Sequence, residues 1–208
     1  MLELGDRDFR IFREVERWRY CLGRHIKILC GFSSQRTCDR RLRLLIAENY
    51  LNRRKVIYGV PGVYTLTYKT KVLISADKKQ EKIRLDNIMH DVTVLDTAIY
   101  FIRHLGLDLS DIITEKQLHQ IDGFGNRKHH PDFVIKKNDE KIAVEIELSQ
   151  KAKNRFQVNL KSNFIEYDEQ IWIVPSVHTN IAQVLQDNKK RYPNISILEL
   201  GEVKNHVI

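Results

Sequence analysis

The chain has 208 residues, of which 42% are hydrophobic and four are proline, a composition typical of a globular protein with one large or two small domains. Its net charge of +8 is uneven: residues 1–85 hold 20 Lys and Arg against 9 Asp and Glu, and residues 86–208 hold 15 against 18. The first region therefore carries +11 (20 − 9), which predicts a module that binds a polyanion, with nucleic acid as the natural partner. A basic surface that serves only solubility is the alternative.

Cysteine spacing and hydropathy argue against a disulfide-stabilised or membrane-inserted protein. Cys21, Cys30 and Cys38 form no C-x2-C pair, and their odd number argues against a disulfide framework, so we expect buried thiols. No cationic stretch leads into an apolar run at the start of the chain, and 18 apolar residues never occur in succession. We therefore expect a cytoplasmic protein that does not insert into a membrane.

The first 75 residues have the order of a winged helix-turn-helix domain. Apolar residues recur every three or four positions in three successive segments, which is the spacing of amphipathic helices. Gly31 suits the end of the second helix, and Ser33 or Ser34 suits the cap of the third. The expected elements are helices over residues 6–20, 21–29 and 35–49 and a β-hairpin with strands over 53–58 and 63–67. Domains with this order bind DNA or serve as protein-interaction modules.

The third expected helix separates an apolar face from a polar one. Cys38, Leu42, Leu45 and Ile46 form the apolar stripe. Arginines on the other face can donate hydrogen bonds to guanine or phosphate, and basic residues at the hairpin can neutralise backbone charge. We therefore expect sequence-specific binding to double-stranded DNA. The residues assigned to this role are Gln35, Arg36, Arg40, Arg43, Arg53, Arg54 and Lys55.

A polar run from Tyr68 to Leu85 has little apolar periodicity and predicts a link between two domains, with the linker proper over residues 76–85. Residues 86–208 then form the second domain. The expected elements are a helix over 86–106, a strand or short helix over 112–118, strands over 130–135 and 141–151, a helix to about 167, a strand over 170–175, a helix over 179–192 and a strand over 195–200. This α/β (α+β) succession with a mixed sheet is the order of the restriction-endonuclease-like fold.

Acidic residues gather at the expected hairpin of the second domain. Asp132 begins its first strand, and Glu145 and Glu147 alternate onto one face of its second strand. Because like charges repel unless a cation or proton is shared, and oxygen ligands suit hard ions, we predict a Mg2+ or Mn2+ site. Glu115 is a candidate fourth ligand. The alternative is an edge hairpin whose acids lie on a solvated face.

The same residues resemble the core motif of the PD-(D/E)XK nuclease superfamily. Pro131-Asp132 match its first part and Glu145-Ile146-Glu147 its second, and Lys151 follows. Glu147 stands where the superfamily usually has Lys, so Lys151 or Lys141 is the candidate for the displaced cation. The whole chain, with HHPDFVI and IAVEIELSQKAKNRF, is similar to the replication-relaxation proteins and MobC-type relaxases of mobilisable plasmids.

The resemblance implies a winged helix over residues 1–75 followed by a PD-(D/E)XK nuclease-like domain over residues 86–208. It also implies a metal-dependent DNA endonuclease, a relaxase that nicks DNA at a transfer origin, with other relaxosome or transfer proteins as further partners. The residues implied as catalytic are Asp132, Glu145, Glu147 and Lys151, the first three also as metal ligands. A catalytically inactive DNA-binding regulator of plasmid replication or transfer is the alternative. Tyr167 and Tyr192 lack neighbouring His ligands of the usual spacing, so a tyrosine-linked mechanism is not expected.

Overall fold

The computed structural model describes residues 2–56, 61–78, 83–123, 128–149 and 153–207. The chain divides into two compact units, Met1–Leu95 and Asp96–Ile208. The domain limits at residues 75 and 86 stay a prediction from the sequence. Helices and two sheets, one of them mixed, make this a mixed α/β protein, which confirms the expected class. Within the described ranges, no helix is long and apolar enough to cross a membrane.

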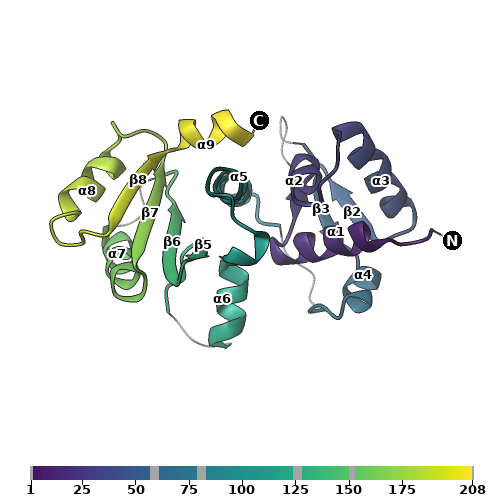
Figure 1. The fold of residues 1–208 in the computed structure, drawn as a ribbon, viewed down its shortest axis with the longest axis horizontal. Coiled ribbons are helices and arrows are strands. Elements are labelled where there is room, and N and C mark those ends of the chain that lie inside the picture. Colours follow the sequence, from purple (N-terminus) through teal and green to yellow (C-terminus); the bar gives the residue numbers. More distant parts are fainter. Residues whose placement is uncertain (1, 57–60, 79–82, 124–127, 150–152, 208) are drawn as a thin grey trace. The chain divides into compact units, whose positions relative to one another are not determined.

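The first unit packs helices on a three-stranded sheet with the order β1-β3-β2, in which both pairs are antiparallel (Figure 1). The apolar stripe of α3 is fully buried at Cys38, Leu42 and Leu45, as its spacing predicted. The elements are α1 (Asp6–Arg17), β1 (Cys21–Leu22), α2 (Gly23–Leu29), α3 (Gln35–Ala47), β2 (Leu51–Arg54), β3 (Val63–Leu66) and α4 (Tyr68–Leu73), followed by the start of α5 (Ile88–Leu105).

Three short segments of the first unit differ from the expectation. The first strand of the hairpin is β2 (Leu51–Arg54), whereas the sequence predicts it over residues 53–58, of which 57 and 58 lie outside the described residues. The sequence predicts a helix that includes Cys21 and Leu22, but they form β1 because they pair with Tyr64 and Val63 of β3. Residues 68–73, assigned to a polar link, form α4, whose first turn is capped by the Thr67 hydroxyl, which accepts a hydrogen bond from the Thr70 amide at 3.3 Å. The polar composition of α4 concealed this helix in the sequence.

The three cysteines are buried and free, as expected. Burial raises the pKa of both the Cys30 and the Cys38 thiol to about 12. These thiols are therefore protonated and unreactive near neutral pH.

The second unit is built on a five-stranded sheet with the order β4-β5-β6-β7-β8. The β4, β5 and β6 strands run antiparallel, whereas β6, β7 and β8 run parallel, so the sheet is mixed as expected. The ambiguous segment divides at Thr114, where β4 ends and a helix begins, and α9 was not expected. The elements after α5 are η1 (Leu109–Asp111), β4 (Ile112–Thr114), α6 (Glu115–Asp122), β5 (Phe133–Lys137), β6 (Glu140–Ile146), α7 (Lys153–Glu166), β7 (Glu169–Val174), α8 (Asn180–Asn188), β8 (Ile195–Glu199) and α9 (Leu200–Val207).

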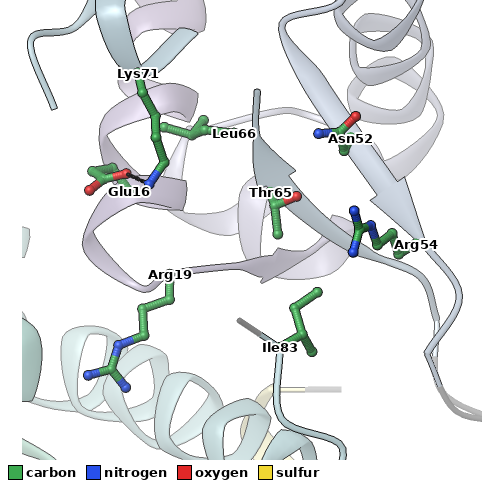
Figure 2. A pocket seen from close by; sticks show the side chains of 8 residues that line it. All are labelled: Glu16, Arg19, Asn52, Arg54, Thr65, Leu66, Lys71 and Ile83. Atoms are coloured by element: carbon green, nitrogen blue, oxygen red, sulfur yellow. Dashed lines mark ion pairs between the residues drawn. The ribbon is translucent and has the colours of Figure 1, made fainter. Parts of the chain in front are cut away.

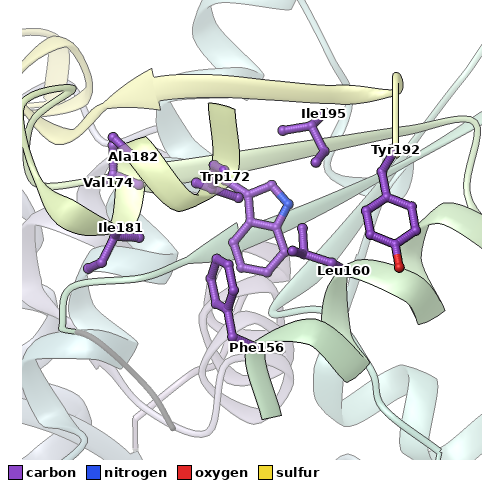
Figure 3. Packing of buried hydrophobic residues seen from close by; sticks show 9 residues of the cluster. Phe156, Leu160, Trp172, Val174, Ile181, Ala182, Tyr192 and Ile195 are labelled. Carbon is purple, nitrogen blue, oxygen red and sulfur yellow. The ribbon is translucent and has the colours of Figure 1, made fainter. Parts of the chain in front are cut away.

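Helices cover both faces of this sheet. On one face Trp172 of β7 packs against Phe156 of α7, with ring centroids 5.0 Å apart, in a cluster that also contains residues of α8 (Figure 3). On the other face Phe133 of β5 contacts Phe101 of α5, with centroids 6.3 Å apart. Parallel pairing of Glu145 with Trp172 places the Glu145 side chain on the α7 face, because directly paired residues point to the same side of a sheet. A carboxylate is thereby buried beneath a helix.

Candidate functional site

Asp132 is held at the carboxyl end of β6. One oxygen of its carboxylate, Oδ2, accepts a hydrogen bond of 2.7 Å from the amide of Ile146, the last residue of that strand. Its backbone carbonyl accepts a second hydrogen bond, of 3.1 Å, from the amide of Glu115. Because the Ile146 amide lies between Glu145 and Glu147 in the chain, these contacts bring the Asp132 carboxylate to the strand segment that carries both glutamates.

Glu145 is 2% exposed, and two side chains bind one of its oxygens. His129 Nε2 lies 2.5 Å from Glu145 Oε1, and Asn163 Nδ2 of α7 donates to the same oxygen at 3.0 Å. An ionised carboxylate only accepts hydrogen bonds, so the His129 tautomer with its proton on Nε2 fits this contact. Both donors offset the charge of a carboxylate that burial would otherwise destabilise.

Glu147 lies just beyond β6 and is also 2% exposed. Its backbone amide donates to the carbonyl of Ile173 at 2.9 Å, so hydrogen bonding to β7 continues to this residue. Lys151, which was assigned a catalytic role, lies outside the described residues. The described part of the site is therefore acidic at the position where the nuclease motif usually has Lys.

Asn163 is a residue of the site that the sequence does not predict. Its side chain is fully buried, and its Oδ1 atom has no hydrogen-bond partner among the described residues. A buried amide oxygen without a partner costs about 1–3 kcal/mol, whereas a bound cation would satisfy it. In the sequence, Asn163 is marked only as a polar residue on the helix that follows Glu145. Asn159 fits the same description, so the sequence does not show which of the two contacts Glu145.

The side chains present fit a hard metal ion by their chemistry. Asp132, Glu145, Glu147 and Asn163 all supply oxygen atoms, which Mg2+ and Mn2+ prefer. Across the described ranges, however, no group of three or more His, Cys, Asp and Glu side chains is arranged to hold a metal ion. The Mg2+ or Mn2+ site therefore stays a prediction.

Glu115, the candidate fourth acid, begins α6 and has a different partner. Its Oε1 lies 3.7 Å from His119 Nε2 one turn later on the same helix, and its side chain is 40% exposed. Its backbone amide donates to the carbonyl of Asp132. The Glu115 amide thus helps to hold Asp132 in position, whereas the Glu115 carboxylate lies near His119.

The segment that carries His129 is anchored on both sides. Lys128 Nζ lies 2.7 Å from Glu166 Oε2 of α7, and this hydrogen bond raises the pKa of Lys128. His130 Nε2 lies 3.5 Å from Asp122 Oδ2 of α6, while burial, with a contribution from the charge of His119, lowers the pKa of His130. These neighbours fix the chain on either side of His129 and so direct its ring to Glu145.

Tyr167 and Tyr192 are poor candidate nucleophiles. Burial, and then the negative charges of Glu166, Asp122 and Glu145, raises the pKa of Tyr167 to about 12. Tyr192 is 4% exposed and packs in the apolar cluster of α7 and α8. The raised pKa keeps the Tyr167 phenol protonated at neutral pH.

In the first unit, α3 presents the expected arginines to solvent. Ser34 caps the helix by accepting a hydrogen bond of 3.1 Å from the Thr37 amide. Arg36, Arg40 and Arg43 are exposed on the face opposite the buried stripe. Gln35 is half-buried, and its Nε2 donates to Asp39 Oδ1 at 2.7 Å.

The basic residues of the hairpin do not share one face. Arg53 lies over the ring of its cross-strand partner Tyr64, with the guanidinium carbon 5.9 Å from the ring centroid. The ring of Tyr64 lies beside Gly23 at the start of α2, as do the side chains of Gln35 and Asp39 from α3. Because successive side chains of a strand alternate, Arg54 points to the opposite face of the sheet. Lys55, just beyond β2, is exposed.

Comparisons with protein-family models, curated proteins and solved structures give no match for this chain. The likeness to replication-relaxation proteins therefore stays a resemblance of residues and element order.

Proposed function

We propose that this chain is a DNA-binding, metal-dependent DNA-processing protein of a plasmid or other mobile element, a relaxase that nicks DNA at a transfer origin. The observation that carries the proposal is the Asp132 carboxylate, bonded to the amide between two buried glutamates at the end of β6. Acids at the end of an antiparallel hairpin that continues into parallel strands are what the PD-(D/E)XK resemblance requires. The second unit is in this proposal a nuclease-like domain.

Asp132, Glu145 and Asn163 would hold Mg2+ or Mn2+, with Glu147 as a further ligand or as a base. When bound, such an ion polarises the scissile phosphate and lowers the pKa of a bound water. His129 and Asn163 orient Glu145 through its Oε1 atom, a role that outer ligands commonly have. Lys151 would neutralise charge on the scissile phosphate, a role that rests on the resemblance alone.

DNA recognition is assigned to the first unit, as a winged helix-turn-helix domain. Its support is the exposed row of Arg36, Arg40 and Arg43 on α3, each a donor that can reach base edges or phosphates. The excess positive charge of residues 1–85 supports the same role through attraction to the phosphate backbone.

The test is nicking of supercoiled DNA from the element that encodes the protein, with Mn2+ added. Wild type should nick this DNA, whereas Asp132→Asn and Glu145→Gln should bind it and leave it supercoiled. Glu140→Gln is the matched control, because it neutralises an exposed glutamate at the other end of the same strand. Specific DNA binding by the wild type without Mn2+-dependent nicking would exclude the enzyme.

A second candidate function is a DNA-binding regulator in which the nuclease-like unit is a scaffold. The observation in its favour is that His129 and Asn163 already bind one oxygen, Oε1, of the buried Glu145 carboxylate. Glu147 in place of the usual Lys supports the same reading. A regulator would bind DNA equally well as wild type or as Glu145→Gln, and Mn2+ would not stabilise it.

A further inference from the structure

The first unit contains a small pocket on the face of its sheet that carries Arg54 (Figure 2). Asn52 and Thr65 are direct cross-strand partners, and Arg54 follows Asn52 by two positions, so the three side chains share this face. Arg19, Glu16 of α1 and Lys71 of α4 also line the pocket. Its volume is about 30 Å³, enough for one or two water-sized groups.

Three polar side chains of the pocket have no partner among the residues that the structure describes. Among the described residues, Asn52, Arg54 and Thr65 make no side-chain hydrogen bond or ion pair. Asn52 and Thr65 are half-buried, and Arg54 is exposed at the rim. An amide, a hydroxyl and a guanidinium together offer several N–H and O–H donors to a ligand that accepts hydrogen bonds.

The charge of the lining side chains is positive. Lys71, whose side chain is 3% exposed, is paired with Glu16 at 3.6 Å and so adds little net charge. By formal charge, the lining residues Arg19, Arg54, Lys71 and Glu16 sum to +2, from three cations and one carboxylate. Arginine is the residue best suited to oxyanions, because its planar fork donates two parallel hydrogen bonds.

We propose that this pocket binds a single phosphate group, with Arg54, Asn52 and Thr65 as the donors. The volume admits one or two oxygens of a phosphate group. The phosphate belongs either to the DNA backbone or to a small molecule such as inorganic phosphate. Arg53 and Tyr64 lie on the opposite face, near α2 and α3, so this contact is separate from the row of arginines on α3.

The first measurement is a calorimetric titration of the full chain with inorganic phosphate at constant ionic strength. Wild type should bind one phosphate with a saturable isotherm, and Arg54→Gln should weaken the affinity about 10- to 100-fold through the loss of charged hydrogen bonds. Arg53→Gln is the matched control, since it removes the same charge from the opposite face of the same strand. Its phosphate affinity should equal that of wild type.

The second measurement separates the two sources of phosphate. If the ligand is the DNA backbone, Arg54→Gln lowers the slope of log affinity against log salt by about one, and inorganic phosphate competes with DNA. If the ligand is a small molecule, DNA affinity stays unchanged while phosphate binding is lost. Either result supports the site. Absence of saturable phosphate binding to wild type, or equal loss in Arg53→Gln and Arg54→Gln, would overturn the proposal.

Discussion

Replacing Asn163 by Leu keeps a buried side chain of similar size and removes both polar atoms of the amide. Without an ion, the variant loses the hydrogen bond from Asn163 to the Glu145 carboxylate, which stabilises the fold by about 1.5–3 kcal/mol. It also removes the unsatisfied Oδ1 atom, which destabilises the wild-type fold by about 1–3 kcal/mol. These contributions nearly cancel. The free energy of unfolding of the metal-free variant should therefore stay within about 2 kcal/mol of wild type.

With an ion present the same substitution should have a clear effect. Loss of a side chain that holds or orients a ligand weakens metal binding about 10- to 100-fold. Mn2+ at a hundredfold excess over the wild-type Kd stabilises wild type by about 2.7 kcal/mol, and the same Mn2+ concentration should stabilise Asn163→Leu by only about 0.4–1.4 kcal/mol. The difference isolates the contribution of one amide to cation binding.

Denaturant unfolding with and without Mn2+ measures this difference directly. Asn154→Leu is the control, because Asn154 lies on the same helix and is exposed. A Mn2+ gain in Asn163→Leu as large as in wild type would remove Asn163 from the site and leave the metal in place. No gain in wild type would refute the metal site itself.

Three further predictions concern other parts of the chain. Arg40→Ala or Arg43→Ala should weaken specific DNA binding by about 1–3 kcal/mol, because each removes a donor from the exposed face of α3; unchanged affinity of both variants at fixed salt would refute the role of this face. Cys30 and Cys38, with pKa values of about 12, should react with an aromatic disulfide at pH 8 about a thousandfold more slowly than thiols of the ordinary pKa of 9.0, and rapid labelling of the folded protein would contradict their burial. Trp172→Ala should lower the free energy of unfolding by about 3–5 kcal/mol in denaturant titrations through the cavity it leaves, and a loss below about 1 kcal/mol would show that the α7–α8 cluster does not stabilise the unit.

The sequence by itself determined those features that depend on a short repeating pattern. The spacing of Cys38, Leu42 and Leu45 identified the buried face of α3, because a helix returns to the same side every three or four residues. Alternation along β6 and the polar turn before it identified the hairpin with β5, and its carboxylates with it. The mixed sheet followed from the order of helices and strands.

Only the tertiary structure decided which distant side chains meet. Cys21 and Leu22 became a strand through partners on β3, some forty residues later, and nothing in their own neighbourhood specifies that pairing. His129 and Asn163 reach Glu145 from the loop before β5 and from α7. Such contacts depend on strand register and on how a helix lies across a sheet, and many alternative pairings share the same local pattern. Periodicity in the sequence therefore identifies the carboxylates of this site, but it does not identify the residues that form hydrogen bonds to Glu145.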